Sequence, residues 1–329
     1  MSVELIVSQF NGDLFRGRRI LVTGGAGFLG SWLCEALIML GANVSCLDNL
    51  STGRVENIMH LKRYGNFKFI KADISEYHPE GFDFIVHGAS LPSPDDYMRR
   101  PVDTMLPNSL GLLNCLEAAR KGSIVLYTST SEVYGDAEII PTPEDYWGRV
   151  NPIGLRSCYD ESKRFGEALC MAYYRQYGVD VRIARIFNSY GPRLDPESRY
   201  ARVIPRFIMQ ALRNEPITIH GDGMQTRSFT YVTDTVNALI KMLINDGVKG
   251  EVVNIGSQNE VKIIDLAKMI IRLTSSSSKI VFTEARPDDP RRRCPDISKA
   301  RKLLNWEPKI SLEDGLKYTI EWFRRQLNG

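Results

Sequence analysis

Short runs of β-branched and aliphatic residues alternate with amphipathic segments along the first half of the chain. Six of these runs predict strands, at residues 19–23, 43–48, 67–73, 82–87, 123–129 and 180–186. Several are apolar throughout, which is typical of strands buried on both faces of a sheet. Helical patterns lie between them, for example at residues 31–40 and 108–121. The alternation predicts an α/β fold with a doubly wound parallel sheet.

The pattern changes after residue 190, where the loops lengthen and the helices become less regular. Residues 252–256 predict one more buried strand that returns to the sheet, and residues 263–273 and 312–326 predict two helices. We therefore expect a cofactor-binding domain at residues 1–190, with a return segment at about 230–257. Residues 191–329 are expected to form a smaller, discontinuous α/β lobe that binds the substrate.

The composition is typical of a folded enzyme rather than of a nucleic-acid-binding or membrane protein. The chain has 329 residues, enough for about two domains, and 42 Lys and Arg residues against 39 Asp and Glu residues give a net charge of +3. Nucleic-acid-binding proteins usually have a strongly basic face, so no nucleic-acid partner is expected. No apolar run reaches the roughly 20 residues of a membrane span, and the N-terminus lacks a signal-peptide pattern. We therefore expect no membrane partner.

The six cysteines, at positions 34, 46, 115, 158, 170 and 294, lack the paired spacing of a zinc site or a disulfide framework. Four of them lie in apolar stretches, where free thiols behave as small hydrophobic groups. We expect reduced thiols, no bound metal and a cytoplasmic location.

A glycine-rich turn follows the first predicted strand and precedes a predicted helix. Its sequence, GGAGFLG at residues 24–30, contains glycines spaced as GxxGxxG. Glycines permit a tight turn and let the backbone approach a pyrophosphate, which then lies at the N-terminus of the helix. The context predicts a Rossmann dinucleotide site. The expected cofactor contacts in the turn are Gly24, Gly27, Phe28, Leu29 and Gly30.

Acidic residues at the ends of the next two strands are placed near the adenosine end of such a cofactor. Asp48 ends the second predicted strand. A carboxylate there accepts a bond from a ribose 2′-hydroxyl and repels a 2′-phosphate, which favours NAD over NADP. Arg54 lies nearby and offers a phosphate a partner, so NADP stays open. Asp73 ends the third predicted strand and is either an adenine-side contact or an ordinary cap.

Tyr159 and Lys163 form a YxxxK pair that can perform acid–base chemistry. The spacing places both side chains on one face of a helix, one turn apart. The Lys163 ammonium, aided by a positive nicotinamide, is expected to lower the pKa of Tyr159 so that the phenol accepts a proton from a sugar hydroxyl. Hydroxyl groups at residues 127–131, Thr130 among them, are expected to bond the reacting oxygen.

These residues together resemble the extended short-chain dehydrogenases that modify nucleotide sugars, over nearly the whole chain from about residue 18. Within that epimerase/dehydratase family the resemblance is strongest to the UDP-glucuronate decarboxylase branch. The stretches that carry it are residues 129–136 (STSEVYGD), 144–163 (EDYWGRVNPIGLRSCYDESK), 184–193 (ARIFNSYGPR), 225–229 (QTRSF), 287–297 (PDDPRRRCPDI) and 305–308 (NWEP). The resemblance implies NAD as the cofactor, a UDP-sugar as the substrate, and a homodimer formed through segments 108–121 and 159–177.

Ser131 and Glu132 distinguish the branches of the family. The 4,6-dehydratases carry Asp-Glu here, with the Asp as the acid for water elimination, and the 4-epimerases usually carry a small or apolar residue at the second position. The Thr130-Ser131-Glu132 sequence is similar to the decarboxylase pattern. Taken alone, Glu132 is equally well explained as a carboxylate that stabilises a helix N-terminus.

The resemblance implies further contacts, one residue at a time. Arg293 is expected to reach the sugar and its carboxylate together with Ser131 and Glu132, although a basic run such as residues 291–293 is otherwise a solvated loop. The other implied substrate contacts are Tyr173, Asn188, Arg202, Thr218, His220 and Arg227. The other implied cofactor contacts are Asn49, Ile74 and Ser90.

Three departures from the family pattern leave the sugar substrate open. Residues 106–108 read Leu-Pro-Asn where Lys-Thr-Asn is common, Gly88 stands where Leu is usual, and residues 199–207 (RYARVIPRF) resemble an epimerase or dehydratase. We expect a decarboxylase that oxidises C4 of UDP-glucuronate, releases carbon dioxide from the resulting β-keto acid and returns the hydride to give UDP-xylose. The alternative is a UDP-sugar 4-epimerase with the same Tyr159, Lys163 and NAD. A binding protein without chemistry is disfavoured, since Tyr159, Lys163 and the glycines are all present.

Overall fold

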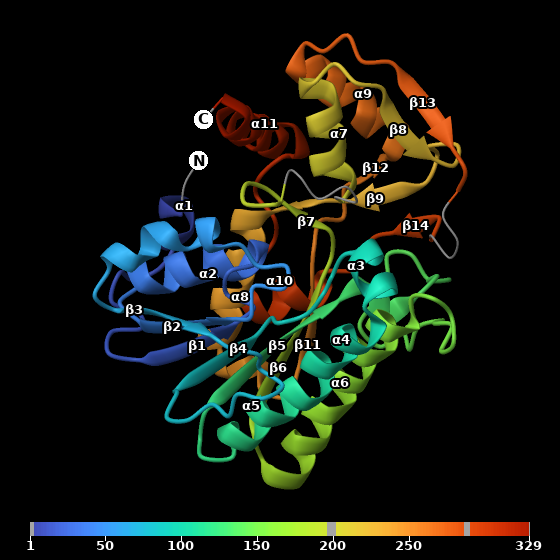
Figure 1. The fold of residues 1–329 in the computed structure, drawn as a ribbon. Coiled ribbons are helices and arrows are strands. Elements are labelled where there is room, and N and C mark those ends of the chain that lie inside the picture. Colours follow the sequence, from blue (N-terminus) through green and yellow to red (C-terminus); the bar gives the residue numbers. More distant parts are fainter. Residues whose placement is uncertain (1–2, 196–201, 286–289, 329) are drawn as a thin grey trace.

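Parallel strands form the central sheet of a larger lobe, with a smaller lobe above the ends of the strands in the view of Figure 1. The structure is a computed structural model that describes residues 3–195, 202–285 and 290–328, so residues 199–201 and 287–289 of two stretches discussed above lie outside it. The order of the seven strands is β11-β6-β5-β4-β1-β2-β3. They are β1 (Arg19–Thr23), β2 (Asn43–Asp48), β3 (Phe67–Lys71), β4 (Phe84–His87), β5 (Ile124–Thr130), β6 (Asp180–Ile186) and β11 (Val252–Ile255). The prediction of a doubly wound parallel sheet is confirmed, including the late return of β11 beside β6.

Helices cover both faces of this sheet. Ile20 and Val22 of β1 pack in one core with α2 (Phe28–Met39) and α8 (Val232–Ile244), whereas Leu21 between them packs with α5 (Leu112–Ala119) and α6 (Ser157–Tyr177). Successive side chains of a strand point to opposite faces. The uninterrupted apolar run of β1 is therefore explained by burial on both faces.

Several boundaries differ from the sequence prediction by a few residues, and three of them near the predicted site have local explanations. Strand β3 ends at Lys71 rather than at Asp73, because the Asp73 carboxylate accepts a hydrogen bond from the backbone N–H of Ser75 at 2.8 Å and begins a turn. Helix α2 begins at Phe28, inside the glycine-rich turn. The helix expected from residue 108 begins with a π-helical turn, η3 (Pro107–Gly111), ahead of α5.

Among the described residues, the smaller lobe contains three helices and two short sheets. Helices α7 (Val203–Leu212), α9 (Ile263–Thr274) and α11 (Leu312–Asn328) contact one another. Strand β8 (Ile217–His220) pairs with β13 (Ile280–Thr283), and β9 (Thr226–Ser228) lies between β12 (Glu260–Lys262) and β14 (Arg292–Arg293). Between these segments the chain returns to the larger lobe as α8, β11 and α10 (Ser298–Leu304), which contacts β11. Strand β7 (Ser189–Tyr190) pairs with β10 (Thr230–Tyr231) where the chain crosses between the lobes.

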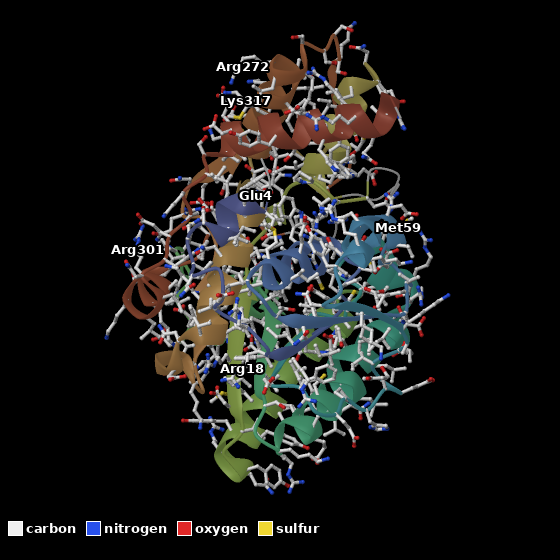
Figure 2. The ribbon with its side chains drawn as sticks, turned by 90° about the vertical axis from the view of Figure 1, so that its left-hand side faces the viewer. Glu4, Arg18, Met59, Arg272, Arg301 and Lys317 are labelled. Atoms are coloured by element: carbon white, nitrogen blue, oxygen red, sulfur yellow. The ribbon has the colours of Figure 1, made fainter. Side chains whose placement is uncertain are left out.

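The remaining elements lie around the large sheet and its loops. In Figure 2, Glu4 of the N-terminal helix lies between Arg18, next to β1, and Lys317 of α11 in the smaller lobe. The elements not described so far are α1 (Glu4–Val7), η1 (Val55–Asn57), η2 (Met59–Arg63), α3 (Pro94–Arg99), α4 (Pro101–Leu106), η4 (Ser131–Tyr134) and η5 (Asp246–Val248). All six cysteines are buried free thiols. Within the described ranges, no helix combines the length and apolarity of a membrane span.

Candidate active site

A cavity of about 1230 Å³ lies at the carboxyl ends of the large-sheet strands and reaches the smaller lobe. In open α/β sheets this edge is where ligands bind. Most of the residues singled out from the sequence line the cavity, and the exceptions are Tyr173, Thr218 and Arg293. The lining residues among them are Gly24, Gly27, Phe28, Leu29, Gly30, Asp48, Asn49, Asp73, Ile74, Ser90, Thr130, Ser131, Glu132, Tyr159, Lys163, Asn188, Arg202, His220 and Arg227.

The glycine-rich turn forms a cradle with no space for side chains. Gly24 has a φ of +68°, and a Cβ there would lie 2.8 Å from the Gly88 carbonyl oxygen. A Cβ on Gly30 would lie 2.2 Å from the Gly24 carbonyl oxygen. Helix α2 begins inside this turn, at Phe28, so the N-terminal end of the helix, with the N–H groups of its first turn, lies at the cavity wall that Gly27 and Phe28 line. The cradle therefore fits a dinucleotide pyrophosphate.

Asp48 and Asp73 occupy the side of the cavity where the adenosine of a dinucleotide would lie. Asp48 accepts hydrogen bonds from the backbone N–H groups of Ala26 at 3.0 Å and Leu50 at 2.8 Å. Burial raises the pKa of Asp48, and these two N–H groups oppose the rise. Asp73 accepts a bond from the Asn49 amide at 2.8 Å, so it both caps a turn and lines the cavity.

Arg54 is engaged by carboxylates. Its guanidinium lies 3.0 Å from an Asp195 oxygen and 3.6 Å from a Glu56 oxygen. The nearby Asp48 carboxylate would repel a 2′-phosphate. The positive charge of Arg54 could offset this repulsion, but it is already paired with the carboxylates of Asp195 and Glu56. This arrangement favours NAD over NADP.

Tyr159 and Lys163 lie one turn apart on α6, both at the cavity wall. The Lys163 ammonium donates to the Thr128 carbonyl oxygen at 2.8 Å and lies 4.9 Å from the centre of the Tyr127 ring. Burial lowers the pKa of Lys163 to about 7. Burial also raises the pKa of Tyr159 to about 12, although a hydrogen bond with Thr130 opposes the rise. Burial therefore dominates the pKa of Tyr159 in the protein chain by itself, and the lowering expected from Lys163 together with a positive nicotinamide stays a prediction.

Tyr97 of α3 stacks on Tyr159, a contact that the sequence did not predict. The two ring centres are 5.2 Å apart and the ring planes differ by 3°. Tyr97 is 1% exposed, and its hydroxyl has no hydrogen-bond partner among the described residues. No local pattern links these two tyrosines, which are far apart in the sequence.

Glu132 is held between two arginines. Its Oε2 lies 2.5 Å from Nη2 of Arg156, and its Oε1 pairs with Arg293, which also donates to the Gly135 carbonyl oxygen at 3.1 Å. Burial alone would raise the pKa of Glu132, but Arg293, Arg156 and Arg227 together lower it to about 2. Glu132 is therefore a permanent anion at neutral pH.

Arg293 is 6% exposed, so the interpretation of a solvated basic loop is wrong for this residue. It does not line the cavity but reaches its wall through Glu132. Arg156, which the sequence analysis missed, does line the cavity. Its position three residues before Tyr159 places it on the same face of the polypeptide, and that spacing was the available signal.

Asp160 is a second buried carboxyl beside this cluster. Burial and the neighbouring Glu132 raise its pKa to about 7, against the opposing charge of Arg156. One of its oxygens has no hydrogen-bond partner among the described residues. In the sequence Asp160 is only one residue within the YxxxK motif, and no local pattern predicts its proximity to Glu132.

The predicted substrate contacts divide into two groups. Asn188, Arg202, Arg227 and His220 line the cavity, and the Asn188 amide donates to the Ser228 carbonyl oxygen at 3.1 Å. Arg202 donates to the Ser189 carbonyl oxygen at 3.4 Å, and His220 contacts Arg206 at 2.9 Å. These four residues come from segments that are separate in the sequence and meet at one wall of the cavity.

Thr218 and Tyr173 are not at this wall. The Thr218 hydroxyl is bonded to Gln210 at 3.0 Å, on the side of β8 that α7 covers. Tyr173 lies 14 residues beyond Tyr159, about 21 Å further along α6, and its hydroxyl donates to Glu117. The predictions of substrate contact for these two residues are therefore wrong within this chain.

Comparison with known proteins identifies the family. Residues 21–319 match the family described as GDP-mannose 4,6 dehydratase. The chain belongs to this family. It is 48% identical over 311 residues to UDP-glucuronic acid decarboxylase 1 of Xenopus tropicalis. This alignment covers 94% of this chain and 73% of that protein. It is 47% identical over 312 residues to UDP-glucuronic acid decarboxylase 3 of Arabidopsis thaliana, with 94% and 90% covered.

A solved structure of the same family extends the comparison to ligands. The UDP-glucuronic acid 4-epimerase from Bacillus cereus, in complex with UDP-glucuronic acid and NAD, superimposes with a TM-score of 0.86. It is 31% identical, and the alignment covers 94% of this chain and 99% of that one. The predicted membership of the extended epimerase and dehydratase family is therefore confirmed.

Proposed function

We propose that this protein is an NAD-dependent decarboxylase that converts UDP-glucuronate to UDP-xylose. The observation that carries the proposal is the Glu132 carboxylate, fixed between Arg156 and Arg293 beside the Tyr159 phenol. A 4-epimerase that acts on a neutral sugar needs the tyrosine but has no use for a fixed carboxylate and two cations beside the sugar. The decarboxylase names of relatives at 46–48% identity support the same choice.

The cofactor half of the cavity would hold NAD through the glycine cradle, Asp48 and Asp73. NAD supplies the reversible acceptance of a hydride from C4 of the sugar. The chain holds the diphosphate of the substrate on the opposite side, where Arg202 and Arg227 line the cavity. Two fixed cations are suited to a diphosphate because charge-assisted hydrogen bonds are the strong ones.

Tyr159 acts as the base that takes the proton from the C4 hydroxyl. The Thr130 hydroxyl, bonded to the phenol, orients it and stabilises its anion. Lys163, fixed on the Thr128 carbonyl oxygen, places a positive charge next to that anion when it is protonated. Both effects lower the cost of forming a buried phenolate, which burial alone makes unfavourable.

The carboxylate-bearing side of the sugar faces Ser131, Glu132 and Arg156, which line the cavity. A ketone at C4 makes the C5 carboxylate part of a β-keto acid, so the C5–carboxylate bond breaks with its electron pair passing into an enolate. Cations near the enolate oxygen stabilise the negative charge that develops there. Because the pKa of Glu132 is about 2, this residue acts as a fixed anion that positions Arg156 and Arg293 rather than as the acid that protonates C5. Water that enters the cavity gives C5 its proton, which restores the C4 ketone that then takes back the hydride.

A UDP-sugar 4-epimerase is the second candidate. Leu106 and Pro107 line the cavity where the decarboxylase branch commonly has a lysine and a threonine, so this wall lacks one cation. The fold similarity to 4-epimerases from Thermotoga maritima and Bacillus cereus favours the same alternative.

The deciding experiment incubates purified holoenzyme with UDP-glucuronate labelled at C6 and follows released carbon dioxide and the sugar nucleotide by NMR. The decarboxylase produces labelled carbon dioxide and UDP-xylose in equal amounts. An epimerase produces UDP-galacturonate and no carbon dioxide, which would overturn the proposal. Bound NAD, measured after denaturation of the same sample, serves as the control for an intact enzyme.

We also propose a homodimer and a cytoplasmic location. Large apolar side chains are exposed on α4, η3 and the outer face of α6, namely Val102 (64% exposed), Leu110 (48%) and Phe165 (51%). An apolar face of this kind is typical of a protein–protein contact. Sedimentation of the wild type and of L110E/F165E tests the dimer, which the two charges should dissociate. Six buried free thiols fit a reducing compartment, and a fluorescent fusion tests the location.

A further inference from the structure

A buried ion pair lies directly behind the acid–base residues, and no step described above uses it. Glu167 of α6 and Arg185 of β6 form a forked pair in which Nε donates to Oε1 at 2.9 Å and Nη2 donates to Oε2 at 2.7 Å. Their side chains are 11% and 12% exposed. Neither residue lines the cavity. A buried pair of this kind gives little net stability, so its presence calls for another explanation.

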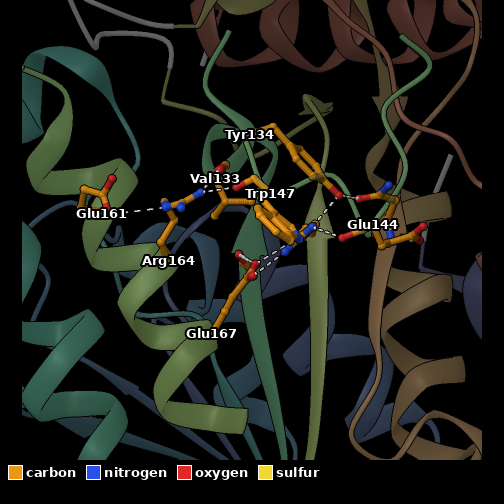
Figure 3. A network of polar contacts seen from close by, with 10 residues as sticks. Val133, Tyr134, Glu144, Trp147, Glu161, Arg164 and Glu167 are labelled. Atoms are coloured by element: carbon orange, nitrogen blue, oxygen red, sulfur yellow. Dashed lines mark hydrogen bonds and ion pairs between the residues drawn. The ribbon is translucent and has the colours of Figure 1, made fainter. Parts of the chain in front are cut away.

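The pair connects two segments that carry different parts of the chemistry. Glu167 lies one turn beyond Lys163 on α6 and also accepts a hydrogen bond from the Ser129 hydroxyl at 2.5 Å. Arg185 donates its remaining N–H groups to the Tyr134 hydroxyl at 2.7 Å and to the Glu144 carbonyl oxygen at 2.9 Å. Figure 3 shows Tyr134, Glu144 and Glu167 converging on this network. Tyr134 belongs to the same short helix, η4, as Glu132.

The charges around Lys163 give the pair a second role. The titratable groups that face Lys163 are Tyr127 from β5, His87 from β4, and Tyr159, Glu167 and Cys170 from α6. Burial raises the pKa of Tyr127 and Cys170 and lowers that of His87 to about 3, so these groups are neutral near pH 7. Tyr159 is neutral as well. Among these described neighbours, Glu167 supplies the negative charge.

We propose that Glu167 and Arg185 are positioning residues: Glu167 keeps Lys163 an ammonium in its buried site, and Arg185 fixes both Glu167 and the loop that carries Glu132. This inference rests on the proposed use of Tyr159 and Lys163 in hydride transfer, and it extends that proposal to two residues outside the cavity. Burial opposes the charge on Lys163, and the Glu167 charge reduces this effect without cancelling it. Arg185 in turn prevents Glu167 from rotating away, because its fork accepts one carboxylate geometry.

The test compares variants that change the charge of the pair in opposite directions. E167Q removes the anion and leaves the Arg185 cation behind Lys163, which favours loss of the Lys163 proton. In the pH profile of kcat, the fall in activity on the alkaline side (the alkaline limb) should therefore move down by about one pH unit. This shift corresponds to about a ten-fold loss of kcat at pH 8, with recovery at pH 6. R185M leaves the anion unpaired, so the same limb should stay in place or move up. E167Q/R185M removes both charges and should bring the limb back toward that of the wild type.

The conservative and remote variants complete the set. E167D keeps the negative charge and should show the same alkaline limb as the wild type. If E167Q does not fold, the comparison of E167D with R185M takes its place. E161Q, which removes a half-buried carboxylate that pairs with Arg164 on the same helix (3.4 Å), should leave the profile unchanged. A fall in kcat by one factor at every pH, equal in E167Q and R185M, would overturn the inference and indicate a purely structural role.

The readout separates this inference from the proposed decarboxylation. The profile is measured on holoenzyme both as UDP-xylose release and as the absorbance of NADH formed on adding a UDP-sugar. If the wild type forms NADH but releases no carbon dioxide, decarboxylation fails while the limb comparison is still read from the hydride step. If carbon dioxide is released but the limb does not move in E167Q, the inference fails alone.

Discussion

The two halves of the cavity are built in different ways. The cofactor half consists of backbone groups and two carboxylates that follow consecutive strands, with Gly24, Gly30 and Asp48 all within residues 24–48. The substrate half consists of side chains from distant segments, with Glu132, Arg156 and Arg293 meeting from three parts of the chain. The proposed dinucleotide site is thus formed mainly by one βαβ unit, whereas the proposed sugar site is formed by charges that only the folded chain brings together.

The difference also appears in the electrostatics. In the cofactor half, burial raises the pKa of Asp48 against two backbone N–H groups. In the substrate half, arginines outweigh burial and lower the pKa of Glu132 to about 2. We therefore expect substitutions in the cofactor half to change affinity for one ligand, and substitutions in the substrate half to change catalysis and stability together.

The largest effect is expected for Y159F. Removing the phenol hydroxyl removes the base for the C4 proton, so kcat should fall by about 10³-fold. The affinity for NAD should stay within about two-fold, since the ring and its stacking on Tyr97 remain. Single-turnover NADH absorbance and equilibrium NAD binding measure the two quantities. Retention of more than a tenth of kcat would show that another group accepts the proton.

E132Q should be the most destabilising of the site substitutions. It leaves Arg156 and Arg293 without their shared carboxylate, at a cost of about 3 kcal/mol in the free energy of unfolding. The folded-state pKa of Glu132 is lowered, so its contribution is present above about pH 4.5 and is lost as the pH falls toward 2. Urea unfolding at pH 7 and pH 3 should therefore show a smaller difference between wild type and E132Q at the lower pH. An equal difference at both pH values would contradict the assignment.

D48N should change cofactor choice without a large loss of stability. Its amide can still meet Ala26 or Leu50, but it no longer repels a 2′-phosphate or bonds the ribose as a carboxylate does. We expect the ratio of NAD to NADP affinity to fall by about ten-fold or more, as is usual for loss of a charged hydrogen bond. Titration of apo-enzyme with each dinucleotide measures it. R54A is the matched control, and an unchanged ratio in D48N would assign selectivity to another residue.

The smallest effect is expected for Y173F. Tyr173 donates to Glu117 near the other end of α6 from the cavity, so the variant loses one partly buried hydrogen bond. Both kcat and KM should stay within about two-fold of the wild type, and the free energy of unfolding should fall by about 1 kcal/mol. A rise in KM for the UDP-sugar would restore the substrate contact that the sequence suggested.

The fold was largely predictable because its signals are local. The strands β1, β2 and β6 begin and end where their predicted runs do, since burial on both faces favours apolar residues at most of their positions. The errors concern boundaries, as at Asp73, where a side chain competes with the backbone for a hydrogen bond and ends the strand early. Thr218 and Tyr173 were misplaced for a different reason, because a motif match gives a position in the chain and not the direction of a side chain.

By itself the sequence determined the parallel sheet, the glycine cradle and the Tyr159–Lys163 pair, because each depends on residues within one turn or one strand–helix unit. Only the tertiary structure decided which charges meet. Arg156 and Arg293 reach Glu132, Tyr97 stacks on Tyr159, and Glu167 pairs with Arg185 behind Lys163. The physical reason is that a pKa depends on burial and on charges within a few ångströms, whatever their separation along the chain.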